Sequence, residues 1–360
     1  MTKSIIERIQ PAVRNISPYT LHEYEYEVKI NQNENPYDVP ADIKQDILDY
    51  ALDRSWSRYP PFVPTRLHEL LADYADWSPD GIITGNGSNE IIQAVMAVLL
   101  PEGGRLVLPT PTFTVYKLIA TIMGGIVDHV PLTPDYQFDC DAVERAARNA
   151  DMVIICSPNN PTGALYSPDR LERLLEMTDA AVIVDEAYYE FSRETVIPLI
   201  RRYDNLIVFR TFSKAFSLAG LRFGYGVMAP VLAAEVKKAA LPYNLNFITT
   251  AAAEKLLENR GRLAVYIDEL IKSRDKLFKD LQFIEGVTVY PSRSNFLLFE
   301  TPYTPKDVFD GLLEDGLLVR DVSSYPMLEQ ALRVSVSTPK DNARFVTALT
   351  RVMNDLSQRR

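Results

Sequence analysis

The sequence predicts an α/β protein with a mainly parallel central sheet and a second, smaller α+β unit. Between about residues 80 and 225, short apolar segments alternate with helical patterns, which is typical of βαβ units. Two of these segments, Met152–Cys156 and 180–184, are apolar throughout, as expected for strands covered on both faces. After residue 245 the order changes to a long helical stretch followed by interleaved strands and helices. We therefore place a large domain at 36–245 and a small domain at 1–35 together with 246–360.

In the large domain, apolar and β-branched runs predict strands at 81–84, 105–108, 152–156, 180–184 and 206–209. Apolar residues at helical spacing predict helices at 65–74, 91–100 and 168–177. In the small domain, residues 247–283 contain few helix breakers and predict a helix. Strands are expected there at 287–290, 295–300, 317–322 and 332–337, with helices at 305–314 and 340–356. Residues 1–30 are expected to form a short helix and an irregular arm that joins the small domain.

Composition excludes several classes of protein. The net charge of −10 and the pI near 5.0 argue against a general nucleic-acid binder. The apolar run 91–100 is far shorter than the roughly 20 residues of a membrane span. The first residues lack the apolar stretch of a signal peptide, so the cytoplasm is the expected location. Two cysteines do not suggest a disulfide framework, and the three histidines have no metal-ligand spacing.

The most informative residue is Lys214, which follows the apolar strand at 206–209. A lysine amine in a partly dry pocket loses its proton more easily and can condense with an aldehyde. Thr211, Ser213 and Arg222 are close in sequence, and hydroxyls with a guanidinium are the donors that a phosphate dianion needs. An amine for an aldehyde beside donors for a phosphate points to pyridoxal 5'-phosphate (PLP). Taken alone, Lys214 would more readily be a surface lysine in a serine-rich loop.

Polar residues that follow other predicted strands argue against Lys214 being a simple surface lysine. Asn160, Asp185 and Tyr188 each come just past a predicted strand, and ligands of open α/β sheets bind at the carboxyl ends of strands. Asp185 would pair with the pyridine nitrogen of PLP and keep the ring protonated. Asn160 and Tyr188 would hydrogen-bond the ring phenolate oxygen. Once substrate has displaced it, Lys214 would be the general base that moves the Cα proton.

Two further segments are expected to contact the cofactor. Gly87, Ser88 and Asn89 form a turn at the start of a predicted helix, where backbone N–H groups and the helix dipole favour phosphate. Ser88 or Asn89 could instead simply cap the helix. Phe113 follows the strand at 105–108 and could stack on the cofactor ring, although a place in the hydrophobic core explains it equally well.

These motifs resemble those of fold-type-I PLP transferases, specifically the class I/II aminotransferases and, within them, the histidinol-phosphate aminotransferases. The resemblance runs from Tyr19 to Arg333 and includes NENPY (33–37), RYP (58–60), GNGSNE (85–90), PTF (111–113), CSPNNPTG (156–163), DEAY (185–188), SKAFSLAGLRFGY (213–225), PYN (242–244), SNF (294–296) and LRVSV (332–336).

The resemblance implies roles for the matching residues. Lys214 would be the Schiff-base lysine, and Arg222 would bind the cofactor phosphate. Tyr59 would reach the cofactor phosphate and substrate of the neighbouring subunit, which implies a homodimer. Arg333 would bind the acidic group on the substrate Cα side, and Arg320 the substrate phosphate. The alternative for Arg320 is a surface ion pair.

The same resemblance assigns Tyr19 and Asn35 to substrate contacts. Asn35 precedes a proline, which holds its backbone extended so that its amide can project. The sequence departs from the family pattern at Gln32, at Asn89, at Ser337 and in a short, acidic arm between residues 19 and 31. No catalytic group is lost, but the arm bears on substrate specificity.

The expected reaction is amino transfer from L-histidinol phosphate to 2-oxoglutarate, giving imidazole-acetol phosphate and L-glutamate. An aromatic or broad-specificity aminotransferase is the alternative on the same scaffold, and a PLP-dependent decarboxylase of a phosphorylated amino acid is a third. A binding module without turnover is disfavoured because Lys214 and Asp185 are both present. A nucleotide-dependent oxidoreductase is disfavoured because the turn at 85–87 does not continue as G-x-G-x-x-G.

Overall fold

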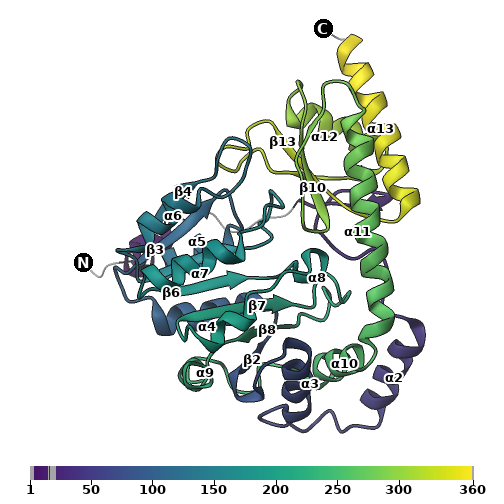
Figure 1. Ribbon diagram of the computed structural model, residues 1–360. Coiled ribbons are helices and arrows are strands. Elements are labelled where there is room, and N and C mark those ends of the chain that lie inside the picture. The colour runs from purple at the N-terminus through teal and green to yellow at the C-terminus, as the bar shows by residue number, and fades with distance from the viewer. Residues whose placement is uncertain (1–3, 15, 17–21, 359–360) are drawn as a thin grey trace.

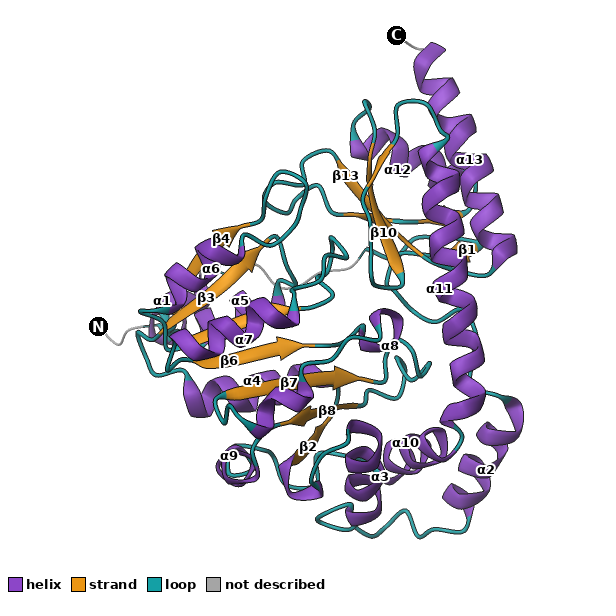
Figure 2. Ribbon diagram, in the orientation of Figure 1, coloured by secondary structure: helices purple, strands orange, loops and turns teal. Residues whose placement is uncertain are grey.

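The computed structural model describes residues 4–14, 16 and 22–358. It has a larger part built on a mixed sheet and a smaller part built on an antiparallel sheet (Figure 1; Figure 2). The predicted α/β fold with a mainly parallel sheet and a smaller α+β unit is confirmed. Where one domain ends and the next begins along the chain stays a prediction. No helix among the described residues has both the length and the apolar character needed to span a membrane.

Among the described residues, seven strands form the larger sheet in the order β2-β8-β7-β6-β5-β3-β4. Neighbouring strands are parallel, except that β8 runs antiparallel to both β2 and β7. The strands are β2 (Ile82–Gly85), β3 (Arg105–Thr110), β4 (Ile126–Pro131), β5 (Met152–Cys156), β6 (Ala181–Asp185), β7 (Leu206–Thr211) and β8 (Gly224–Val227).

Both faces of this sheet are buried, as the continuous apolar strands predict. In β5, Val153 and Ile155 belong to the hydrophobic cluster on one face, while Met152, Ile154 and Cys156 belong to the cluster on the other. The covering and flanking helices are α1 (Pro11–Arg14), α2 (Ala41–Leu52), α3 (Thr65–Ala75), α4 (Ser88–Leu99), α5 (Val115–Ile122), α6 (Cys140–Ala147), α7 (Pro168–Met177), α8 (Tyr189–Ser192), α9 (Pro230–Val236) and α10 (Phe247–Glu258).

The smaller part contains a four-stranded antiparallel sheet in the order β12-β13-β10-β9. Its elements are β9 (Thr288–Val289), β10 (Phe296–Glu300), β12 (Arg320–Asp321), β13 (Ala331–Ser335), α12 (Pro305–Glu314) and α13 (Pro339–Gln358). A short strand near the N-terminus, β1 (Val28–Lys29), pairs in parallel with β11 (Leu317–Leu318). This pairing brings the segment that follows β1 to the boundary between the two parts. The long helix α11 (Arg260–Gln282) runs beside both parts (Figure 1).

Two features of the fold differ from the sequence-based expectation. The helical stretch 247–283 is two helices, α10 and α11, which meet at Asn259. Helix α10 packs on α2 and α3 of the larger part. Strands β4 and β8 were not expected, because β8 contains two glycines and β4 has exposed or half-buried residues at all positions but one.

Candidate active site

A cavity of about 390 Å³ lies between the two parts, at the carboxyl ends of β5, β6 and β7. The segment that follows β1, together with β12 and β13, closes it from the side of the smaller part. Most of the predicted site residues line this cavity: Ser88, Asn89, Phe113, Asn160, Asp185, Tyr188, Thr211, Ser213, Lys214, Arg222, Arg320 and Arg333. The fold therefore brings together side chains that are up to 245 residues apart in the chain (from Ser88 to Arg333).

Lys214 lies in the loop after β7 and is half-buried. Its Nζ donates a hydrogen bond to the backbone carbonyl of Gln32, over 2.8 Å. Burial, with a smaller contribution from the positive charge of Arg333, lowers the pKa of the Lys214 amine to about 8. A sizeable fraction of this amine is therefore neutral close to physiological pH, which is the state that can attack an aldehyde or accept a proton.

Asp185 ends β6 and is almost completely buried. Its Oδ2 accepts a hydrogen bond of 2.6 Å from the Tyr116 hydroxyl, and its Oδ1 accepts one of 3.0 Å from the backbone N–H of Ala187. Burial raises the pKa of the Asp185 carboxyl to about 6, while these two hydrogen bonds act to lower it. With a pKa of about 6 this carboxyl is mostly ionised at neutral pH, and the two donors support its charge.

Tyr116 was missed by the sequence analysis although it contacts Asp185 and lines the cavity. It belongs to α5, which begins just after Phe113, and the two rings meet edge to face with centroids 5.4 Å apart. A signal was present in the sequence: Tyr116 follows Phe113 by three residues, so it too lies just past a strand end, where ligands of α/β sheets bind.

Tyr188 and Asn160 are each held by a partner from the smaller part or from the segment after β1. The Tyr188 hydroxyl accepts a hydrogen bond of 2.9 Å from Asn33 Nδ2, and burial raises the pKa of this phenol. Asn160 Oδ1 accepts one of 2.6 Å from Arg333 Nη1, and Arg333 Nη2 donates to the backbone carbonyl of Asn31 over 2.6 Å. Hydrogen bonds therefore hold both side chains in place, just past the carboxyl ends of β5 and β6.

Asn33, which the sequence analysis did not select, faces the cavity, whereas the predicted Asn35 does not line it. Asn33 has a left-handed φ of 57°, a conformation that asparagine tolerates better than most residues. Asn35 instead donates to the backbone carbonyl of Ala215 over 3.0 Å and so ties its segment to the loop that carries Lys214. Its predicted contact with substrate remains a prediction.

A cradle of donors lies at the N-terminus of α4. Gly87 is the N-cap residue with a φ of 81°, and the structure shows no side-chain cap there, so the capping alternative for Ser88 and Asn89 does not apply. Arg222 Nη1 donates to Ser213 Oγ over 3.2 Å. A Cβ added to Gly87 would lie 2.6 Å from Arg222 Nη2, so the glycine keeps this space open. A helix N-terminus, hydroxyls and a guanidinium fit a phosphate dianion.

Two arginines line the wall of the cavity that the smaller part forms. Arg320 on β12 and Arg333 on β13 are partners across the two antiparallel strands. Within the described part of the chain, no hydrogen bond or ion pair holds the guanidinium of Arg320, so the surface ion-pair alternative finds no support there. Tyr325, which the sequence analysis also missed, lines the cavity beside them.

Besides Gly87 and Asn35, one more described residue of the predicted site does not line this cavity, and another lies outside the described residues. Tyr59 is 80% exposed and stacks on Tyr243, with ring centroids 4.5 Å apart. Tyr19 lies outside the described residues. The predicted roles of both residues remain predictions.

Comparison with known proteins agrees with the geometry. The family model for aminotransferase class I and II matches residues 26–349. The chain is 37% identical over 348 residues to the histidinol-phosphate aminotransferase of Chlorobaculum tepidum, covering 96% of this chain and 100% of that protein. It is 36% identical over 354 residues to the protein of the same name from Chlorobium limicola, covering 97% and 99%.

Solved structures show the same fold. The histidinol-phosphate aminotransferase of Clostridium acetobutylicum superposes with a TM-score of 0.86 at 25% identity, covering 91% of this chain and 100% of that one. The enzyme of Sinorhizobium meliloti, solved in complex with pyridoxal 5'-phosphate, has a TM-score of 0.86 at 23% identity and covers 97% and 98%. The predicted family, fold and enzyme class are confirmed: this chain belongs to the class I and II aminotransferases.

Proposed function

We propose that this protein is a PLP-dependent aminotransferase that moves the amino group of L-histidinol phosphate to 2-oxoglutarate, giving imidazole-acetol phosphate and L-glutamate. Relatives named histidinol-phosphate aminotransferase match almost the whole chain at 34–37% identity. The observation that carries the proposal is the pair of arginines, Arg320 and Arg333, on the cavity wall formed by the smaller part. A plain amino acid needs one guanidinium for its carboxylate, whereas a phosphate ester dianion has room for two.

The donor set of the cavity fits PLP. The cradle at Gly87, with Ser213 and Arg222, would hold the phosphate, and the carboxylate of Asp185 would accept a hydrogen bond from the protonated ring nitrogen. When bound, PLP supplies an electron sink for the bond that breaks at the substrate Cα. Tyr188, Asn160 and Phe113 also line the cavity. Tyr188 and Asn160 would hydrogen-bond the phenolate oxygen of PLP, and Phe113 would pack against its ring.

Lys214 holds and moves the proton. In the free enzyme its Nζ donates to the Gln32 carbonyl, which keeps the amine inside the cavity. Burial lowers the pKa of this amine to about 8 in the free enzyme, so part of it is neutral near pH 7. Such an amine would accept a proton from Cα and return it. Arg333 would orient the substrate by its acidic group, held in turn by Asn160 and Asn31.

Replacing Arg320 by alanine tests the substrate assignment. We expect kcat/KM to fall far more for L-histidinol phosphate than for L-phenylalanine, because only the former has a phosphate for this guanidinium to bind. A matched control is Arg351→Ala, which removes a surface arginine paired with Asp315 and should leave kcat/KM unchanged for both substrates. Equal losses for both substrates would show that Arg320 does not read the phosphate, and would favour the aromatic or broad-specificity alternative.

We further propose that the enzyme is a homodimer whose active sites are shared. Trp56, Tyr59 and Phe62 are exposed. The rings of Tyr59 and Phe62 contact Tyr243, and Trp56 contacts Phe247. Pro60, Phe62, Tyr243 and Phe247 line a second cavity of about 390 Å³. A second copy of the chain covering this apolar surface would bring Tyr59 to its neighbour's cofactor phosphate. We also place the enzyme in the cytoplasm, in keeping with its two free cysteines.

Mixing two inactive variants tests the shared site. In a mixed dimer of Lys214→Ala and Tyr59→Ala subunits, one site carries both substitutions and the other carries neither, provided that Tyr59 serves its neighbour. Activity should therefore reappear after the two variants are unfolded and refolded together. If Tyr59 acts within its own subunit or not at all, mixing will restore nothing beyond the activity of each variant alone.

A further inference from the structure

A third hydrophobic cluster lies between the two parts of the molecule, separate from the two clusters that cover the larger sheet. From the larger part it takes Leu132 and Tyr136, which follow β4. From the smaller part it takes Leu298 together with Val322, Leu328 and Ala331. The loop between β4 and α6 reaches the smaller part to form this contact (Figure 1). The cluster therefore joins a loop of the larger sheet to the segment that follows β12.

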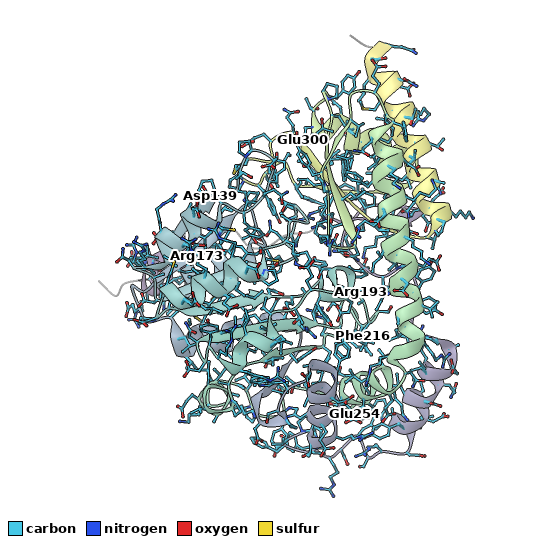
Figure 3. The ribbon with its side chains drawn as sticks, in the orientation of Figure 1. Asp139, Arg173, Arg193, Phe216, Glu254 and Glu300 are labelled. Carbon is cyan, nitrogen blue, oxygen red and sulfur yellow. The ribbon has the colours of Figure 1, made fainter. Side chains whose placement is uncertain are left out.

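Tyr136 connects the two sides of this cluster by hydrogen bonds. Its hydroxyl lies 2.5 Å from Glu300 Oε1 and 2.9 Å from the backbone carbonyl of Met327. Glu300 is labelled in Figure 3, above Asp139 at the start of α6. The Tyr290 hydroxyl donates to Glu300 Oε2 over 2.9 Å, and the two tyrosine rings meet edge to face with centroids 4.7 Å apart. Both tyrosines thus contact the same carboxylate, but Tyr136 also contacts the Met327 carbonyl.

The segment 322–328, which we call the wall segment, forms part of the substrate cavity. It begins two residues after Arg320, and its Tyr325 side chain both lines the cavity and packs against the third cluster. The segment is neither helix nor strand. It has turn hydrogen bonds, from the Tyr325 N–H to the Val322 carbonyl and from the Leu328 N–H to the Tyr325 carbonyl. Its position depends on what it packs against, because no sheet ladder fixes it.

Tyr136 is itself held firmly. It is 5% exposed and has a left-handed φ of 60°, a conformation that is rare for a bulky side chain and persists only where the surroundings impose it. Its hydroxyl has one hydrogen and two oxygen acceptors, the Glu300 carboxylate and the Met327 carbonyl, so this hydrogen is shared between them in a three-centre hydrogen bond.

We propose that Tyr136 is a positioning residue for substrate binding: it holds the wall segment against the larger part and so fixes Tyr325 and the neighbouring Arg320 at the substrate end of the cavity. The proposal rests on the proposed function only in taking this cavity as the place where substrate binds. Tyr136 lies outside the cofactor site, since it does not line the cavity that contains Lys214 and Asp185. Its loss should therefore affect substrate binding and leave the chemical step unchanged.

Two variants separate this role from a general loss of packing. Tyr136→Phe removes the contact with Met327 and one hydrogen bond to Glu300, whereas Tyr290→Phe removes only a hydrogen bond to Glu300. In Tyr136→Phe, hydrogen exchange at the amides of Tyr325 and Leu328 should become faster, and KM for the amino donor should rise by roughly 2- to 10-fold with kcat unchanged. In Tyr290→Phe, both quantities should stay close to those of the unaltered protein.

The exchange measurement needs no substrate, so it judges the proposal even if histidinol phosphate proves not to be the amino donor. In that case the KM comparison is made with L-glutamate. Unchanged exchange and KM in Tyr136→Phe would overturn the proposal. So would equal changes in both variants, because these would assign the effect to the Glu300 carboxylate and not to the contact with Met327.

Discussion

Removing the Tyr116 hydroxyl should shift the pH range in which the protein binds its cofactor. Asp185 pairs with the ring nitrogen only when ionised, and burial already raises the pKa of its carboxyl to about 6. Tyr116 donates to this carboxylate over 2.6 Å, and a hydrogen bond to a charged group is worth about 1.5–3 kcal/mol. At about 1.4 kcal/mol per pKa unit, Tyr116→Phe should raise the pKa of Asp185 by roughly one to two units.

The assay is the dissociation constant of PLP from the cofactor-free protein, measured between pH 5 and 9. In the unaltered protein the affinity should weaken as the pH falls through the pKa of Asp185 near 6, since the protonated carboxyl no longer attracts a protonated ring. In Tyr116→Phe the same weakening should begin roughly one to two units higher. Tyr166→Phe, another buried tyrosine that does not line the cavity, is the control. Curves that coincide for all three proteins would refute this account of Asp185.

Three other substitutions test separate parts of the structure. Lys214→Ala should abolish multiple turnover. PLP should still bind, but without a covalent bond, so that dialysis removes it. Normal turnover would contradict the role of Lys214 as the proton carrier. Gly87→Ala should weaken PLP binding much more than Gly103→Ala. Both glycines have a positive φ, but only at Gly87 would a Cβ crowd Arg222, which is proposed to bind the phosphate. Equal PLP affinities of the two variants would contradict a phosphate site at Gly87. Glu186→Gln should lower the free energy of unfolding in urea by about 3–5 kcal/mol, because it breaks the buried ion pair with Arg210. Glu194→Gln, which breaks an exposed ion pair with Arg293, should lower it by less than about 1 kcal/mol. Similar losses in the two variants would contradict this difference.

The residues at the ends of the central strands could be predicted from the sequence. Asn160, Asp185 and Lys214 each follow an apolar run, and a parallel sheet necessarily collects the carboxyl ends of its strands at one edge. The larger core was predictable for the same reason, because strands such as Met152–Cys156 have no polar residue to place in solvent. Local pattern and global fold agree at these positions.

Residues whose roles depend on contacts between distant segments could not be predicted in this way. Asn33 reaches Tyr188 across 155 positions of the chain, and nothing in the local sequence ranks it above Asn35. Tyr136 and Tyr325 matter because two irregular segments pack together, and irregular segments carry no periodic signal. Strand β8 was missed because its glycines pack closely, Gly224 against Ser88, where the local sequence gives no apolar run.

The most direct test of the central claim is the half-reaction of the PLP-loaded protein with single amino donors. The protein is mixed with L-histidinol phosphate, L-phenylalanine or L-glutamate, and the absorbance of the cofactor is followed in the absence of any oxo acid. Our account predicts rapid conversion by L-histidinol phosphate, well ahead of L-phenylalanine. Faster conversion by L-phenylalanine would contradict the assignment of the substrate, and no conversion by any of the three would contradict amino transfer itself.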